Sequence, residues 1–248
     1  MGHGSTSNPR SSTPPRWPAN ATPSSRCGAR CSAEGRHILA PQLEPQAAFA
    51  RVPSHAWWAL AALLAGGSLL ATALDPRQLD WQPALAAAQP WRCWSAAWVH
   101  WSDGHRWANI AGAALVAVFG WRARCDAFDA LAWFVAWPLT QVGLLMQPTL
   151  LHYGGLSGVL HAGVVVAAAS LCQREQGARR LLGALVLAGV ALKVVLEQPW
   201  RGPLQRMPGW DIAIAPAAHL SGAAMGGVCA LAAAAWRRHR LAPLGGAP

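Results

Sequence analysis

Six long apolar stretches, separated by short polar turns, leave this chain few ways to fold. Crossing the hydrocarbon core of a bilayer takes about 20 mainly apolar residues in a helix, and a backbone in lipid must satisfy its own hydrogen bonds. The sequence therefore predicts an all-α membrane protein with six transmembrane helices. These helices are expected at about residues 56–74, 105–121, 130–146, 156–172, 181–196 and 216–236.

The composition excludes an ordinary soluble domain, because 53% of the 248 residues are hydrophobic and only 12% are charged. Basic residues outnumber acidic ones by 20 to 10, but the arginines lie in tails and short turns, not along one helix face. We therefore expect the lipid bilayer, and no nucleic acid, as a partner. The two tails and the turns after the second and fourth stretches hold 14 of the 20 Lys and Arg. By the positive-inside rule, both termini are expected in the cytoplasm.

The chain divides into three parts by composition. Residues 1–53 are rich in Ser, Pro, Ala and Arg without an apolar period, which predicts a disordered basic cytoplasmic tail. Residues 54–240 hold the six apolar stretches, and residues 241–248 form a short C-terminal tail. A Trp-rich segment between the first two stretches is too apolar for water, so we expect it to lie in the membrane interface with its tryptophans as anchors.

Polar side chains begin three of the predicted helices, all on the outer side of the membrane. His105 and Asn109 lie one turn apart on the second, Ser157 begins the fourth within a Gly-x-Ser-Gly sequence, and His219 begins the sixth. Polar groups inside a membrane are costly and usually mark a functional site. A histidine can take the proton of a serine, and nearby donors can stabilise the resulting oxyanion. We place no Asp or Glu at this depth in the three helices, so we expect a Ser–His dyad without a metal or cofactor.

The joint pattern of these residues resembles that of the rhomboid intramembrane serine proteases. The resemblance rests on Trp91-Arg92, His100-x4-His105-x3-Asn109, Gly155-Leu156-Ser157-Gly158 and Ala218-His219-x2-Gly222-x3-Gly226. It implies a six-helix rhomboid-like bundle in which Ser157 is the nucleophile and His219 the base. It also implies that His105 and Asn109 help to bind the oxyanion. The implied substrate is a transmembrane protein.

Five further residues have supporting roles in this interpretation. Gly222 and Gly226 would let the sixth helix approach the fourth closely, as small residues at this spacing do elsewhere. Gly155 and Gly158 would remove side-chain bulk beside the serine. His100 either anchors the loop or reaches the substrate.

Within the rhomboids, the sequence is similar to the rhombosortase branch. The run from Tyr153 to His161 carries this similarity, with Lys193-x3-Glu197-Gln198 closing the fifth predicted helix. His161 stands where many rhomboids have an aromatic residue that stacks on the catalytic histidine, and an imidazole can also stack. Lys193 and Glu197 are one helical turn apart, so a structural ion pair is expected. The branch implies cleavage of the Gly-Gly C-terminal anchor of exported proteins, near the outer face of a bacterial inner membrane.

Simpler interpretations stay open at this point. His105 and Asn109 could hydrogen-bond the Trp-rich segment, and the glycines around Ser157 could serve only a turn or a tight helix contact. As a whole, the chain could be a catalytically silent rhomboid-like protein that binds membrane clients. A small membrane transporter is a further alternative, although its spans would be expected to carry more carboxylates. The His-Glu-x-x-His motif of a membrane zinc protease is absent from the sequence.

Overall fold

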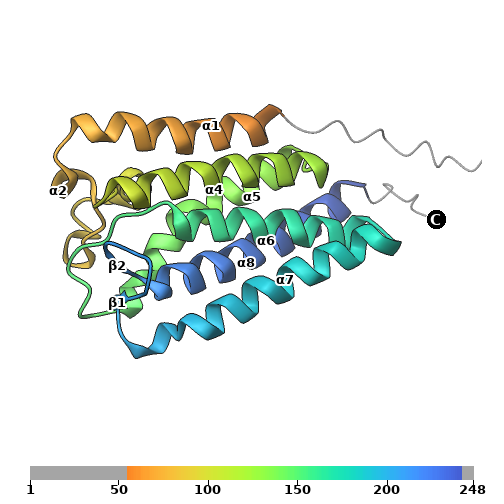
Figure 1. Ribbon diagram of the computed structural model, residues 1–248. Coiled ribbons are helices and arrows are strands. Elements are labelled where there is room, and N and C mark those ends of the chain that lie inside the picture. The colour runs from red at the N-terminus through yellow and green to blue at the C-terminus, as the bar shows by residue number, and fades with distance from the viewer. Residues whose placement is uncertain (1–54, 242–248) are drawn as a thin grey trace, which may run out of the picture. The chain divides into compact units, whose positions relative to one another are not determined.

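Residues 55–241, the part of the chain that the computed structural model describes, form six long helices joined by short elements (Figure 1). The long helices are α1 (His55–Leu70), α4 (Asp103–Arg122), α5 (Ala127–Val142), α6 (Ser157–Arg174), α7 (Gly177–Glu197) and α8 (Pro216–Leu241). The short helices are α2 (Pro76–Leu79) and α3 (Arg92–Ser95). Strands β1 (Gln205–Arg206) and β2 (Ala213–Ile214) form an antiparallel hairpin, in which Gln205 faces Ile214.

Each of the six predicted stretches overlaps one long helix, and the chain is an all-α membrane protein. Four helical spans are long and apolar enough to cross a membrane, namely His55–Ala73, Ala127–Met146, Gly177–Arg201 and Pro216–His239. Helices α4 and α6 are not among these four, and both carry charged residues near their ends, such as Asp103 and Arg122 on α4 and Arg174 on α6, besides polar candidate site residues. The predicted tail at residues 1–53, and all but the first residue of the predicted segment 241–248, lie outside the described residues.

Helix α6 is the centre of the bundle. It packs against α4, α5, α7 and α8, and small residues such as Ala162 and Ala167 are fully buried on it. Helix α1 covers α4 and α5 from outside, while α7 packs on α6 and α8 and leaves most of its own surface exposed. The element that begins with Ser157 is therefore the one most completely surrounded by other helices.

Close contact between α6 and α8 depends on glycine. A β-carbon built on Gly222 would overlap the carbonyl group of Gly158, and one built on Gly226 would lie 2.6 Å from the carbonyl oxygen of Ala162. On the other side of the same contact, a β-carbon on Gly158 would lie 2.7 Å from the carbonyl oxygen of Ala218. The structure thus confirms that Gly222 and Gly226 permit a close approach of these two helices.

Four tryptophans differ from the expectation that this residue type serves mostly as an interface anchor. Trp57, Trp81, Trp133 and Trp137 are buried in the protein interior, each at most 1% exposed. Trp133 donates a hydrogen bond from its indole to the carbonyl oxygen of Val159 at 2.8 Å, which satisfies its polar atom inside the core. Trp133 fills the space beside Gly163 of α6, and Trp57 fills the space beside Gly120 of α4. These wide rings therefore contribute to the packing of the bundle.

The Trp-rich segment between α1 and α4 docks on the chain just before α6. Arg92 donates to the main-chain oxygen of Asp80 at 2.7 Å and to its carboxylate at 3.0 Å. The second carboxylate oxygen of Asp80 lies 2.6 Å from Nδ1 of His152, an exposed residue of the loop before α6. Next to this pair, Trp81 and Tyr153 exchange two main-chain hydrogen bonds of 2.7 and 2.9 Å. The residues that lead into Ser157 are therefore held by the Trp-rich segment.

At the opposite end of the bundle, a network of ion pairs joins α5, α6 and α8. Asp126 and Asp129 form a capping box at the start of α5, and Arg174 and Arg237 each contact both carboxylates. Burial alone would raise the pKa of Asp126, but the two arginines hold it below its ordinary value. Paired charges of this kind fix the relative positions of the three helix ends.

We expect Gly226→Ala to lower the free energy of unfolding by about 1–3 kcal/mol, because the new methyl group would meet the main chain of α6. Gly227→Ala is the matched control on the same helix. Its β-carbon would have only Val165 nearby, at 3.9 Å, and alanine favours a helix. Thermal unfolding of the detergent-solubilised proteins measures both. Equal melting temperatures for the two variants would contradict the close contact.

Candidate active site

A cavity of about 580 Å³ lies where α4, α6 and α8 begin and α7 ends. Helix starts supply His105 and Asn109 from α4, Ser157 and His161 from α6, and His219 from α8 to its wall. The hairpin of β1 and β2 covers one side through residues such as Ile214. The sequence-based expectation that three helix starts meet at one level is confirmed by this arrangement (Figure 1).

Ser157, His219 and Glu197 form a line of two short polar contacts. His219 Nε2 lies 2.9 Å from Ser157 Oγ, and His219 Nδ1 lies 2.6 Å from Glu197 Oε2. If the proton of the neutral imidazole is on Nδ1, it donates to the carboxylate and leaves Nε2 free to accept the serine proton. His219 and Glu197 are buried, with 6% and 8% exposure, so water competes little for these contacts.

The expected Ser–His dyad has no carboxylate, but in the structure the Glu197 carboxylate lies 2.6 Å from His219. The expectation rests on the three helices that begin at this level. Glu197 is instead the last residue of α7, which runs in the opposite direction and ends there. The Lys193–Glu197 pair at the end of an otherwise apolar stretch was the signal that could have located it. The predicted ion pair is present, with Lys193 Nζ bonded to Glu197 Oε1.

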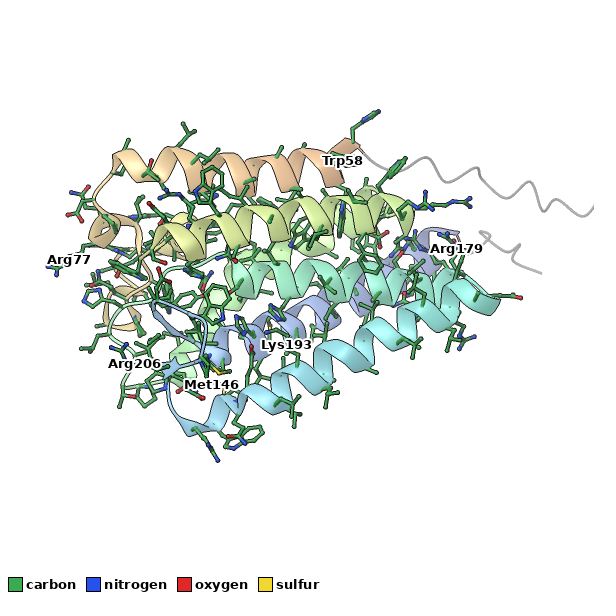
Figure 2. The ribbon with its side chains drawn as sticks, viewed as in Figure 1. Trp58, Arg77, Met146, Arg179, Lys193 and Arg206 are labelled. Atoms are coloured by element: carbon green, nitrogen blue, oxygen red, sulfur yellow. The ribbon has the colours of Figure 1, made fainter. Side chains whose placement is uncertain are left out.

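Lys193 belongs to the same cluster. Its ammonium group is half-exposed, lines the cavity and lies 3.5 Å from His219 Nδ1 as well as against Glu197 (Figure 2). An isolated carboxylate among apolar side chains is costly, and a paired cation offsets much of that cost. Lys193 therefore offsets part of the energetic cost of the negative charge on Glu197 beside His219.

His161 stacks on His219 as the sequence suggests. The ring centroids are 4.4 Å apart with an interplanar angle of 18°, and His161 Nδ1 lies 2.7 Å from the carbonyl oxygen of Ser157. One side chain thus contacts both the serine backbone and the face of the imidazole. This stacking contact restricts the orientation of the His219 ring.

Unused hydrogen-bond donors face the same cavity. Asn109 lines it, is 5% exposed, and its Nδ2 atom has no hydrogen-bond partner among the described residues. His105 also lines the cavity, with Nδ1 unpartnered and with Trp210 edge-on to its ring at 6.0 Å. Among the described residues, neither side chain makes a hydrogen bond to the Trp-rich segment, and no side chain caps the start of α6. These groups and the first amides of α6 are available to an oxygen of a bound molecule.

His100 lies behind this layer and is not part of the cavity wall. Its Nδ1 is 3.1 Å from the carbonyl oxygen of Trp98, and its ring is edge-on to His105 at 5.0 Å. Burial and the neighbouring His105 lower the pKa of His100 to about 4, so it is neutral near pH 7. These contacts fit the first of its two predicted roles, that of a loop anchor.

Tyr153 is a further residue at the site, for which the sequence alone predicted no role of its own. Its hydroxyl donates to the carbonyl oxygen of Gly155 at 3.2 Å, close to the Ser157 side chain and the Gly158 amide. Burial raises the pKa of Tyr153, so the phenol stays protonated and remains a donor. Gly155 has a φ of +153°, a backbone conformation that favours glycine. Tyr153 thus stabilises the turn that presents Ser157.

Within residues 55–241, no group of three or more His, Cys, Asp or Glu side chains is suited to hold a metal ion. The chain matches no family model, and a comparison with curated proteins finds no match.

The geometry predicts a serine that reacts with a fluorophosphonate probe in detergent solution. Ser157→Ala should abolish labelling, and His219→Ala should slow it roughly 10²- to 10⁴-fold, because a positioned base contributes this much. Ser68→Ala, which removes another buried hydroxyl, is the matched control and should label normally. Mass spectrometry locates the modified residue. Labelling that persists in Ser157→Ala would show that this serine is not activated.

Proposed function

We propose that this chain is an intramembrane serine endopeptidase of the rhomboid type. Ser157 is the nucleophile, His219 the general base, and Glu197 the group that orients His219. The observation that carries the proposal is the pair of contacts at 2.9 and 2.6 Å through one buried imidazole, which ends at a serine on a cavity wall. A protein that only binds membrane clients has no need of this alignment.

In the proposed reaction, Ser157 Oγ attacks the carbonyl carbon of the scissile peptide bond while His219 Nε2 takes the hydroxyl proton. The carbonyl oxygen becomes negative and accepts hydrogen bonds from Asn109 Nδ2 and from the amide at the start of α6. His105 lies beside this position on the cavity wall. His219 then gives the proton to the leaving amine, and an incoming nucleophile such as water releases the acyl group from Ser157.

All six long helices cross the bilayer in this proposal, with both termini in the cytoplasm of a bacterium and the site near the outer face of its inner membrane. The position of α6 supports a span despite its polar residues, because four other helices surround it and keep those residues from lipid. The orientation is supported by charge. The arginine-rich turns after α4 and α6 lie at the end of the bundle away from Ser157 (Figure 1).

The proposed substrate is a transmembrane anchor that begins with a glycine pair, as the resemblance to the rhombosortase branch implies. A helical substrate hides its peptide bonds in its own hydrogen bonds, so the segment at the site must unwind, and glycine lowers that cost. Gly158 packs directly on the main chain of α8, which leaves little width beside Ser157 and favours small substrate residues. The basic tip of such an anchor would stay in the cytoplasm and bring the glycines level with Ser157.

The test is co-expression with an exported reporter that ends in a Gly-Gly sequence, an apolar helix and a basic tip. We expect release of the reporter, with a new C-terminus at or next to the glycines by mass spectrometry, and none with Ser157→Ala. A reporter with both glycines replaced by leucine should remain anchored. Cleavage on the cytoplasmic side, or release that is indifferent to the glycines, would refute the proposed substrate.

Glu197→Gln should lower kcat about 10²- to 10⁴-fold, because the neutral amide no longer holds the imidazole with its proton on Nδ1. Glu175→Gln is the matched control, since Glu175 pairs with Arg179 at the far end of the bundle. Initial cleavage rates of the purified variants measure the difference. Turnover near that of the unmodified protein in Glu197→Gln would mean that Ser157 and His219 suffice as a dyad.

Asn109→Ala should lower kcat roughly 10²- to 10³-fold and change KM little, because the lost donor acts only on the developing oxyanion. Asn109→Asp is nearly isosteric but replaces the donor with an acceptor, so it should be at least as slow. An equal loss of fluorophosphonate labelling and cleavage would agree with this role. A rate unchanged by both substitutions would show that Asn109 does not donate to the oxyanion.

A further inference from the structure

Seven arginine side chains that the structure describes gather at the end of the bundle opposite the candidate active site. Arg179 donates to the carbonyl oxygen of Arg122 at 2.8 Å, so the turn after α6 lies against the turn after α4. Figure 2 shows Arg179 at the same end as Trp58, with Arg77 and Arg206 at the other end. The seven are Arg122, Arg124, Arg174, Arg179, Arg180, Arg237 and Arg238.

Three of these arginines already have carboxylate partners. Arg174 and Arg237 bind Asp126 and Asp129, and Arg179 binds Glu175. These are all the acidic residues that the structure describes at this end. The remaining four arginines are exposed, and the described part of the chain offers them no carboxylate. We call this set, Arg122, Arg124, Arg180 and Arg238, the basic rim.

The basic rim lies beside exposed indole rings. Trp58 and Trp121 are 41% and 46% exposed, with ring centroids 6.5 Å apart, and the Arg122 guanidinium lies 5.9 Å from the Trp121 ring centre. Exposed tryptophans on membrane proteins prefer the level of the lipid headgroups. The rim is therefore placed at the depth where phosphate groups lie.

We infer that the basic rim is a binding surface for the phosphate groups of anionic phospholipids. The positive-inside bias acts on such residues during insertion, and in the folded protein the four guanidinium groups remain exposed, with no carboxylate partner among the described residues. Guanidinium binds phosphate through paired N–H donors, and a basic residue near an anionic leaflet gains favourable energy there. Lipid binding at the basic rim depends on the exposed arginines at this end of the bundle and does not rest on the proposed proteolysis.

The experiment uses the full chain in a neutral detergent, with phosphatidylglycerol or phosphatidylcholine added. Native mass spectrometry counts bound lipids, and thermal unfolding measures the linked stabilisation. We expect phosphatidylglycerol to bind and to raise the melting temperature, with an effect that weakens as salt is added. In R122Q/R124Q/R180Q the affinity should fall about tenfold or more, whereas R77Q/R201Q/R206Q removes three exposed arginines from the other end and should bind normally.

Two further arms separate the alternatives. R122K/R124K/R180K keeps the charge but loses the paired N–H donors, so it should bind phosphatidylglycerol less tightly than the unmodified protein and more tightly than R122Q/R124Q/R180Q. This variant also tests the assignment if the glutamine variant folds poorly. Inorganic phosphate, used as a probe without acyl chains, should give a much smaller rise in melting temperature. Equal losses in the rim and control variants, equal effects of the two lipids, or a full effect of inorganic phosphate would overturn the assignment.

Discussion

The approach of α8 to α6 determines whether Ser157 and His219 can meet. Gly158, Gly222 and Gly226 bring the two backbones together where any side chain would separate them, and the hydrogen bond between Ser157 and His219 spans the same contact. Leu156 and Val159, on either side of the serine, are fully buried. A wider separation of the helices by one methyl group would therefore act directly on the distance between the two side chains.

Carboxylates lie at both ends of this bundle, and the ones that hold its helix ends are paired with cationic or histidine side chains. Glu197 has Lys193 and His219, while Asp126 and Asp129 have Arg174 and Arg237. Neutralisation limits the cost of placing carboxylates among apolar helices. The two clusters differ in the polar groups that lie next to the paired carboxylates. At one end a histidine faces a cavity, and at the other unpaired arginines face outward.

Much of this arrangement could be predicted from the sequence, because apolar length and residue spacing are local properties. The six helices and the meeting of Ser157, His219, His105 and Asn109 at one level followed from them. Glu197 was missed as a partner of His219 because its helix runs the other way, and a comparison of helix starts cannot detect a helix end.

Three-dimensional packing was harder to foresee. Trp133 is an interface residue by type, yet it fills the space beside Gly163 and bonds Val159 within the core. Tyr153 and Trp81 pair across a long separation in the chain, and no periodic pattern marks such a pairing. Contacts of this kind depend on which surfaces meet, and a single sequence does not state that.

The order of residues along the chain has a consequence in time. Ser157 and His219 are 62 positions apart, and His219 lies at the start of α8, the last helix in the described part of the chain. During synthesis, α6 is made before α8, so Ser157 is without the His219 imidazole until α8 has packed. Glu197 arrives between the two, at the end of α7. The line of contacts from Ser157 through His219 to Glu197 is therefore incomplete until α8 has been made and has packed against α6.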